Sequence, residues 1–111
     1  MQTENHSWSY NEFIAFLLIC AAEMNSSLSK EELSFIEKQT GVEDILKIKT
    51  VVDSVSDASA IDIIDEYRKK YLATPEKLQQ AKNDLENLLN TPGLHSQLQK
   101  AAVHILEKFL Q

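Results

Sequence analysis

The side chains of this chain that could do chemistry are mainly carboxylates. Asp62, Asp65 and Glu66 are spaced i, i+3 and i+4, so on a helix they project from one face, and Asp57 precedes them by one to two turns. Hard divalent cations bind convergent oxygen ligands of this kind. Glu32 would join the set if the fold brought its helix close. These five acids are therefore the candidate metal ligands of the chain.

The same acids have a simpler interpretation, which we favour. Carboxylates are stabilised in the first turns of a helix by its dipole. Asp65 and Glu66 also stand four residues before Lys69 and Lys70, which is the spacing of helical ion pairs. We therefore expect a solvated acidic face with no bound metal, and keep a divalent-cation-binding domain as the alternative.

The other reactive residue types form no recognisable motif. His6, His95 and His104 are not spaced as ligands on one helix face, and two glycines cannot build a phosphate loop. Cys20 is the single cysteine, so the chain has no internal disulfide and no cysteine-rich zinc site. Since Cys20 lies in an apolar run, we expect a small, buried and unreactive side chain. We predict no cofactor and no enzyme activity, and keep a small enzyme of unknown class as a further alternative.

Charge and hydropathy exclude several partners. The formal net charge of −6 repels polyanions, and Arg68 is the only arginine, so we expect no nucleic-acid binding. The apolar run from Phe13 to Ala22 is about half the length of a membrane span. The residues before it include Glu4 and Glu12 and no basic residue, unlike a secretory signal. We expect a cytoplasmic protein without a membrane span.

Two segments of the chain follow the same pattern at a helix start. Residues 8–13 and 28–33 each read apolar, Ser, two residues, Glu, apolar. In each, the Ser can cap a helix while the Glu three residues later accepts from the N–H of the cap, and the flanking apolar pair can form a hydrophobic staple. The pattern predicts a helical hairpin with helix starts twenty residues apart.

The apolar spacing predicts an all-α fold, a compact bundle of five to six helices around a buried first helix. The first helix is apolar on all sides, as expected for a helix surrounded by others. Residues 1–8 form a frayed leader, in which only Trp8 is apolar and large, and residues 9–111 form a single domain. The third element carries many β-branched residues, so a short strand is its alternative. The expected helices are Tyr10 to Met24, Lys30 to Thr40 ended by Gly41, Val42 to Val55, Ser56 or Asp57 to Leu72, Pro75 to Leu89 capped by Thr74, and a last one carrying Leu94 to Phe109.

The junction between the first two helices resembles that of the TerB-like domains found in tellurite resistance and co-chaperone proteins. An apolar helix ends in Ala21-Ala22, and after a tight turn Leu28, Ser29 and Glu32 match the aliphatic residue, serine and acid of that family. Asn25 and Ser26 stand where the family usually has Asp and Gly. The resemblance implies a compact all-helical module without catalysis that acts in stress-response assemblies. It also implies an acidic surface proposed to bind metal ions.

These observations give a leading hypothesis for function. We expect a non-catalytic helical interaction module of TerB-like type, which works through a protein partner or as a homo-oligomer. We also expect the turn from Asn25 to Ser27 to be structural and folding to need no divalent cation, because its tip carries neutral oxygens only.

Overall fold

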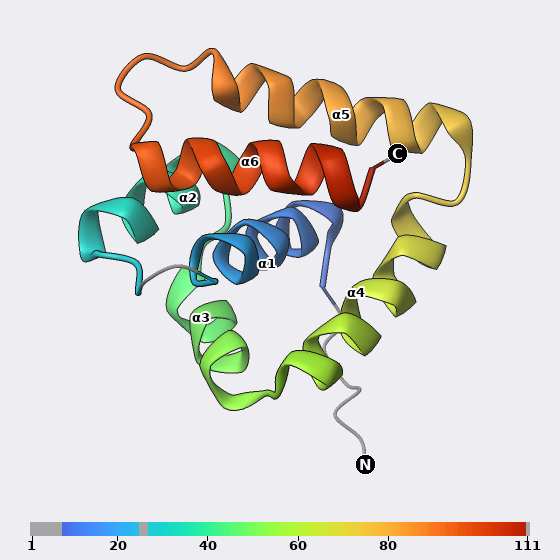
Figure 1. Cartoon of the computed structure of the whole chain (residues 1–111), viewed down its shortest axis with the longest axis horizontal. Helices are drawn as coiled ribbons and strands as arrows, with labels where there is room; N and C mark the ends of the chain where they lie inside the picture. Colours follow the sequence, from blue (N-terminus) through green and yellow to red (C-terminus); the bar gives the residue numbers. More distant parts are fainter. Residues whose placement is uncertain (1–7, 25–26, 111) are drawn as a thin grey trace.

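The computed structural model describes residues 8–24 and 27–110, and within these ranges all regular structure is helical. The predicted all-α class is confirmed. The leader before Trp8 and the tip of the Asn25–Ser27 turn lie outside the described residues. The helices are α1 (Tyr10–Ala22), α2 (Lys30–Thr40), α3 (Ile45–Ser54), α4 (Asp57–Tyr71), α5 (Pro75–Leu89) and α6 (Ser96–Lys108) (Figure 1).

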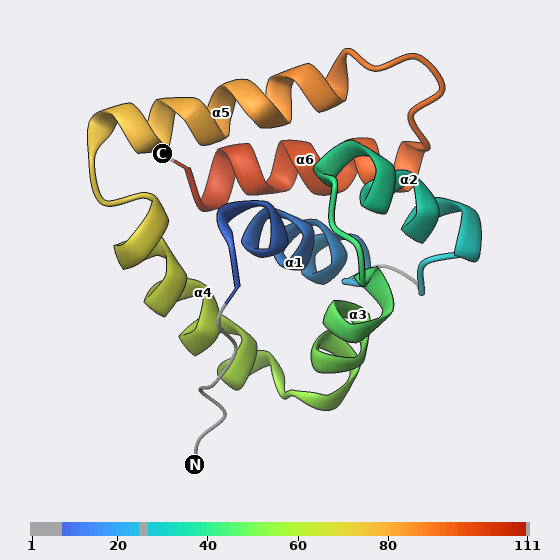
Figure 2. The ribbon, with the colours of Figure 1, turned by 180° about the vertical axis from the view of Figure 1, so that it is seen from behind.

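The first helix is the centre of the fold, as predicted. Phe16 and Ile19 are both fully buried, and α1 contacts α2, α3, α4 and α6. Figure 1 and the reverse view in Figure 2 show α5 and α6 side by side along one flank of α1, with α3 and α4 on the opposite flank. Burying a helix on every side requires apolar residues at every position of its circumference, which explains the unbroken apolar run.

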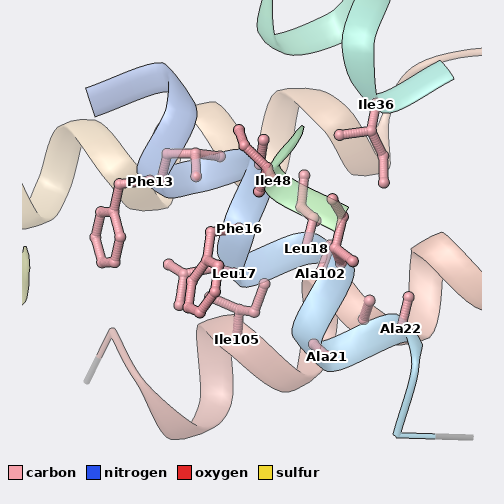
Figure 3. Close-up of a cluster of buried hydrophobic side chains, with 14 of the residues drawn as sticks. Phe13, Phe16, Leu17, Leu18, Ala21, Ala22, Ile36, Ile48, Ala102 and Ile105 are labelled. Atoms are coloured by element: carbon pink, nitrogen blue, oxygen red, sulfur yellow. The ribbon is translucent and has the colours of Figure 1, made fainter. Parts of the chain in front are cut away.

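Apolar side chains from several helices meet α1 in one core. Figure 3 shows Ile36 of α2, Ile48 of α3 and Ile105 of α6 among the α1 side chains, and each of the three is at most 2% exposed. The core therefore joins segments that are far apart in the chain. Among the residues that the structure describes, none of the helices is long and apolar enough to cross a membrane.

Both predicted capping boxes are present. Ser9 Oγ accepts from the Glu12 N–H at 3.2 Å, and Glu12 Oε1 accepts from the Ser9 N–H at 2.9 Å. At α2, Ser29 and Glu32 make the same pair of bonds at 3.1 and 2.9 Å. Each box satisfies two of the backbone donors that a helix start otherwise leaves unpaired.

The other predicted helix ends are largely correct. Gly41 ends α2 with φ of 74°, a left-handed conformation that glycine adopts without steric cost. Ser56 is the N-cap of α4, and Thr74 caps α5 before Pro75 at its first position. The third element is a helix, so its strand alternative is wrong. It begins at Ile45 because the Asp44 carboxylate accepts from the Lys47 N–H and starts the helix there.

Aromatic side chains fix the start of α1 to α4. The backbone N–H of Trp8 donates to Tyr67 Oη at 3.1 Å, and Tyr71 Oη donates to the backbone carbonyl of Trp8 at 2.7 Å. The Trp8 ring stacks on Tyr67 with centroids 5.3 Å apart and lies 4.7 Å from that of Phe16. Trp8 is only 7% exposed, so this residue is part of the core, although the sequence placed it in the leader.

Candidate functional site

The candidate metal ligands are distributed over two helices. Asp57, Asp62, Asp65 and Glu66 are all exposed on α4, whereas Glu32 is buried at the start of α2 and accepts from the Ser29 backbone. Across residues 8–24 and 27–110, no three His, Cys, Asp or Glu side chains are grouped so that they could hold a metal ion. The structure does not bring these acids together.

The ion pairs expected on α4 also differ from the prediction. Asp65 pairs with Arg68, one turn away, at 3.6 Å, rather than with Lys69. The Lys70 ammonium lies over the Tyr71 ring, 5.2 Å from its centroid, so the expected pair with Glu66 is not formed. Both cations contact near neighbours on α4 itself, and because exposed helical ion pairs are worth only a few tenths of a kcal/mol, i,i+3 and i,i+4 partners differ little in free energy.

A carboxylate that the sequence analysis passed over closes the end of α1. Glu23 Oε2 accepts from the Leu28 N–H at 3.1 Å and pairs with Lys49 Nζ at 3.0 Å. Lys49 also donates to Asp53 at 2.7 Å. Hydrogen bonding between these two side chains raises the pKa of Lys49 and lowers that of Asp53.

This network explains why α1 ends at Ala22 instead of continuing to Met24 as predicted. Glu23 is the C-cap, and its side chain holds the backbone of Leu28. The Gln97 amide of α6 donates to the Ala22 carbonyl at 2.9 Å, which satisfies a helix-end acceptor. The partners come from α3 and α6, which the local sequence of α1 does not reveal.

Two open hollows lie on the surface beside this end of α1. The first has a volume of about 570 Å³ and lies between α1, the α3–α4 junction and α6. The second, of about 580 Å³, lies between the end of α1 and α6. The hollows share Ala21, Met24 and His104, and we call the continuous surface that they form the Met24 trough. The apolar wall of the first hollow includes Leu17, Val52, Val55, Ala60, Ile64 and Phe109.

Exposed apolar side chains gather at this trough. In the described part of the chain, four large apolar side chains are exposed, namely Met24 (67%), Leu46 (64%), Ile61 (52%) and Val103 (36%). All except Leu46 line one or both hollows. Exposed apolar side chains that line a hollow are candidates for a binding surface, because a partner that covers them removes them from water. Sequence reasoning missed this gathering, because it depends on where the fold places the ends of α1, α4 and α6.

Cys20 lies in the wall of the first hollow. It is half-buried rather than fully buried as expected. Burial first, and then the charges of Glu23 and Asp57, raise the pKa of the Cys20 thiol from 9.0 to about 12. The thiol therefore stays protonated at neutral pH, and only the thiolate is a strong nucleophile. The trough holds no activated cysteine.

The other strongly perturbed group is Tyr10. Its hydroxyl donates to Asp84 Oδ2 at 2.6 Å, in a third hollow of about 320 Å³ between α1, α2 and α5. Burial and then the Asp84 carboxylate raise the pKa of Tyr10, which keeps the phenol neutral. Asp84 Oδ1 also accepts from Gln80 at 2.9 Å. The Tyr10 hydroxyl therefore acts as a neutral hydrogen-bond donor that joins α1 to α5, and not as a base.

Comparison with known proteins adds no family. No model of a protein family matches this chain, and neither a curated protein nor a solved structure does.

Proposed function

We propose that this chain is a non-catalytic helical interaction module of TerB-like type, which acts in the cytoplasm and binds a partner protein through the Met24 trough. The observation that carries the proposal is the gathering of Met24, Ile61 and Val103 at two adjoining open hollows that share Met24. Apolar side chains in a concave surface gain binding free energy when a partner removes them from water.

The chemistry of the perturbed groups supports a module without catalysis. The raised pKa values of Cys20 and Tyr10 favour their neutral protonated forms, whereas a nucleophile or a general base requires the opposite shift. Two observations support the TerB-like type. The fold is helical around a buried α1, and Ser29 and Glu32, which match the serine and the acid of that family, form the capping box of α2. An association with stress-response assemblies follows from that resemblance.

Site-specific photo-crosslinking in the native host tests this function. A photoreactive amino acid at Val103 places the probe in the trough, whereas the same residue at Leu46 places it at an exposed apolar position of α3 outside both hollows. We expect a discrete crosslinked partner from position 103 and not from position 46.

The substitution Met24→Glu, which introduces a negative charge, supplies the second arm. It should abolish the crosslink from position 103 while Leu46→Glu, at a side chain of almost equal exposure, leaves it intact. The proposal is wrong if position 103 yields no crosslink, or if the crosslink is insensitive to Met24→Glu in a protein that is folded by circular dichroism.

A further inference from the structure

The shape of the Met24 trough favours an elongated occupant. Its two hollows are similar in volume and meet at Ala21, Met24 and His104, so the trough runs from the α3–α4 junction, where its lining is mainly apolar, to α6, where Met24 and Val103 lie among polar residues. A compact ligand would fill one hollow and leave the other in water. An amphipathic helix presents apolar side chains at i, i+3, i+4 and i+7, and can place side chains in both hollows.

The charges of the trough are mainly negative. Glu23 and Asp57 line the first hollow, whose lining contains no lysine or arginine. The second hollow contains Glu107 and one cation, Lys100. Glu23 is already paired with Lys49, whereas Asp57 and Glu107 form no ion pair with a residue in the described part of the chain. An occupant with basic residues would therefore meet two available carboxylates.

A second observation locates the negative potential inside the first hollow. Burial is the largest cause of the raised pKa of Cys20, which lies in the wall of that hollow, and the charges of Glu23 and Asp57 raise it further. Their fields therefore reach the surface that an occupant would cover, where removal of water strengthens electrostatic interactions.

The same charges disfavour the other classes of occupant. Anionic membranes and nucleic acids would be repelled by these carboxylates and by the net charge of −6. A second copy of the chain, paired through a two-fold axis at the trough, would place the acidic rims of the two copies against each other.

On the basis of the proposed function, we propose that the occupant is a basic amphipathic helix of a partner protein. Its apolar face would lie on Met24, Ile61 and Val103, with lysine or arginine side chains next to Asp57 and Glu107. Apolar contact would supply most of the affinity, and the carboxylates would select basic helices over acidic ones.

Three synthetic peptides test this inference on the intact chain. Each has about four helical turns with the same leucine stripe, and its polar face carries lysine, glutamine or glutamate. Affinity is measured by fluorescence anisotropy at low and at moderate salt. We expect the lysine peptide to bind about tenfold or more tightly than the glutamate peptide, with the glutamine peptide between them, and the difference to shrink with salt.

Single substitutions then assign the effect to the trough. Asp57→Asn should weaken binding of the lysine peptide several-fold and leave the affinity for the glutamine peptide unchanged. Asp62→Asn, on the same helix but outside both hollows, should change neither affinity. Met24→Glu should abolish binding of the glutamine peptide, and Leu46→Glu should not.

The outcomes separate this inference from the proposed function. If the glutamate or glutamine peptide binds as tightly as the lysine peptide, the basic helix is wrong. It is also wrong if no peptide binds while the crosslink from position 103 persists, or if sedimentation shows a dimer that Met24→Glu disrupts. If the peptides and the crosslink both fail, the trough is not a docking surface and both proposals are wrong.

Discussion

The Cys20 thiol makes the stability of the fold depend on alkaline pH. Its pKa is raised from 9.0 to about 12 in the folded chain. In the unfolded chain burial and the fixed carboxylates are lost, so the thiol there titrates near its ordinary value. Above pH 9 the unfolded state therefore binds fewer protons than the native state, and the free energy of unfolding falls as the pH rises toward 12.

The expected magnitude follows from the two pKa values. The loss approaches about 1.4 kcal/mol per pH unit once the unfolded thiol is ionised. Integrated between about pH 8 and about pH 10 it is about 1.4 kcal/mol, and the partial exposure of Cys20 reduces this to about 1 kcal/mol. At neutral pH the effect disappears, because both states then hold the proton.

Urea unfolding under reducing conditions measures this effect. The fluorescence of Trp8, the only tryptophan and a buried residue, reports unfolding. Wild type and Cys20→Ala are compared at about pH 8 and about pH 10. The wild type should lose about 1 kcal/mol more than the variant over this range.

Tyr10→Phe provides a control, because the raised pKa of Tyr10 also lowers stability as the pH rises above 10. The Cys20→Ala difference should remain in that background. If wild type and Cys20→Ala lose stability equally, Cys20 has an ordinary pKa, and the proposed negative potential in the first hollow is absent.

Four further predictions concern the α2 cap, the effect of divalent cations, one hydrogen bond and the core. Ser29→Ala should destabilise the fold by about 1 kcal/mol through loss of the α2 cap. Thermal melts of the chain with calcium, magnesium or EDTA should superimpose. A melting point several degrees higher with one cation would favour the ion-binding alternative. Tyr71→Phe should cost about 1 kcal/mol by urea unfolding, because the Trp8 carbonyl loses its 2.7 Å donor, and an unchanged midpoint would contradict that bond. Phe16→Ala should cost about 3–5 kcal/mol, a large fraction of the stability of a domain of this size, and a loss below about 1 kcal/mol would mean that α1 is not central.

The parts of the fold that depend on neighbouring residues were predictable from the sequence. The capping boxes of α1 and α2 use residues three apart, and Gly41 supplies a conformation that other residues rarely adopt. The central place of α1 was also predictable, because a helix that is apolar on all sides must be covered on all sides.

The features that depend on residues distant in the chain were not predictable. The end of α1 is set by Glu23 with Lys49 of α3 and by Gln97 of α6. No local pattern indicates where α1 ends. The ion pair of α4 is local, but exposed pairs are so weak that the sequence does not decide between i,i+3 and i,i+4 partners.

The candidate site was missed for a related reason. The acids that the spacing singled out share a helix face but do not converge, whereas the trough forms only where the ends of α1, α4 and α6 meet. Met24 and Cys20 could be expected on the surface only once those neighbours are placed. A sequence pattern shows which residues share a helix face, but not where several helices leave a hollow between them.

A backbone amide shift map tests most directly whether the Met24 trough is a docking surface. The isotope-labelled chain is titrated with the lysine peptide, and the shift of each amide signal is recorded. The shifts should concentrate at the end of α1, the α3–α4 junction and α6, and leave most of α5 unchanged, since α5 contributes no residue to either hollow. Saturating shifts centred on α5 or on the exposed face around Leu46, or no shifts at all, would contradict the assignment of the trough as the binding surface.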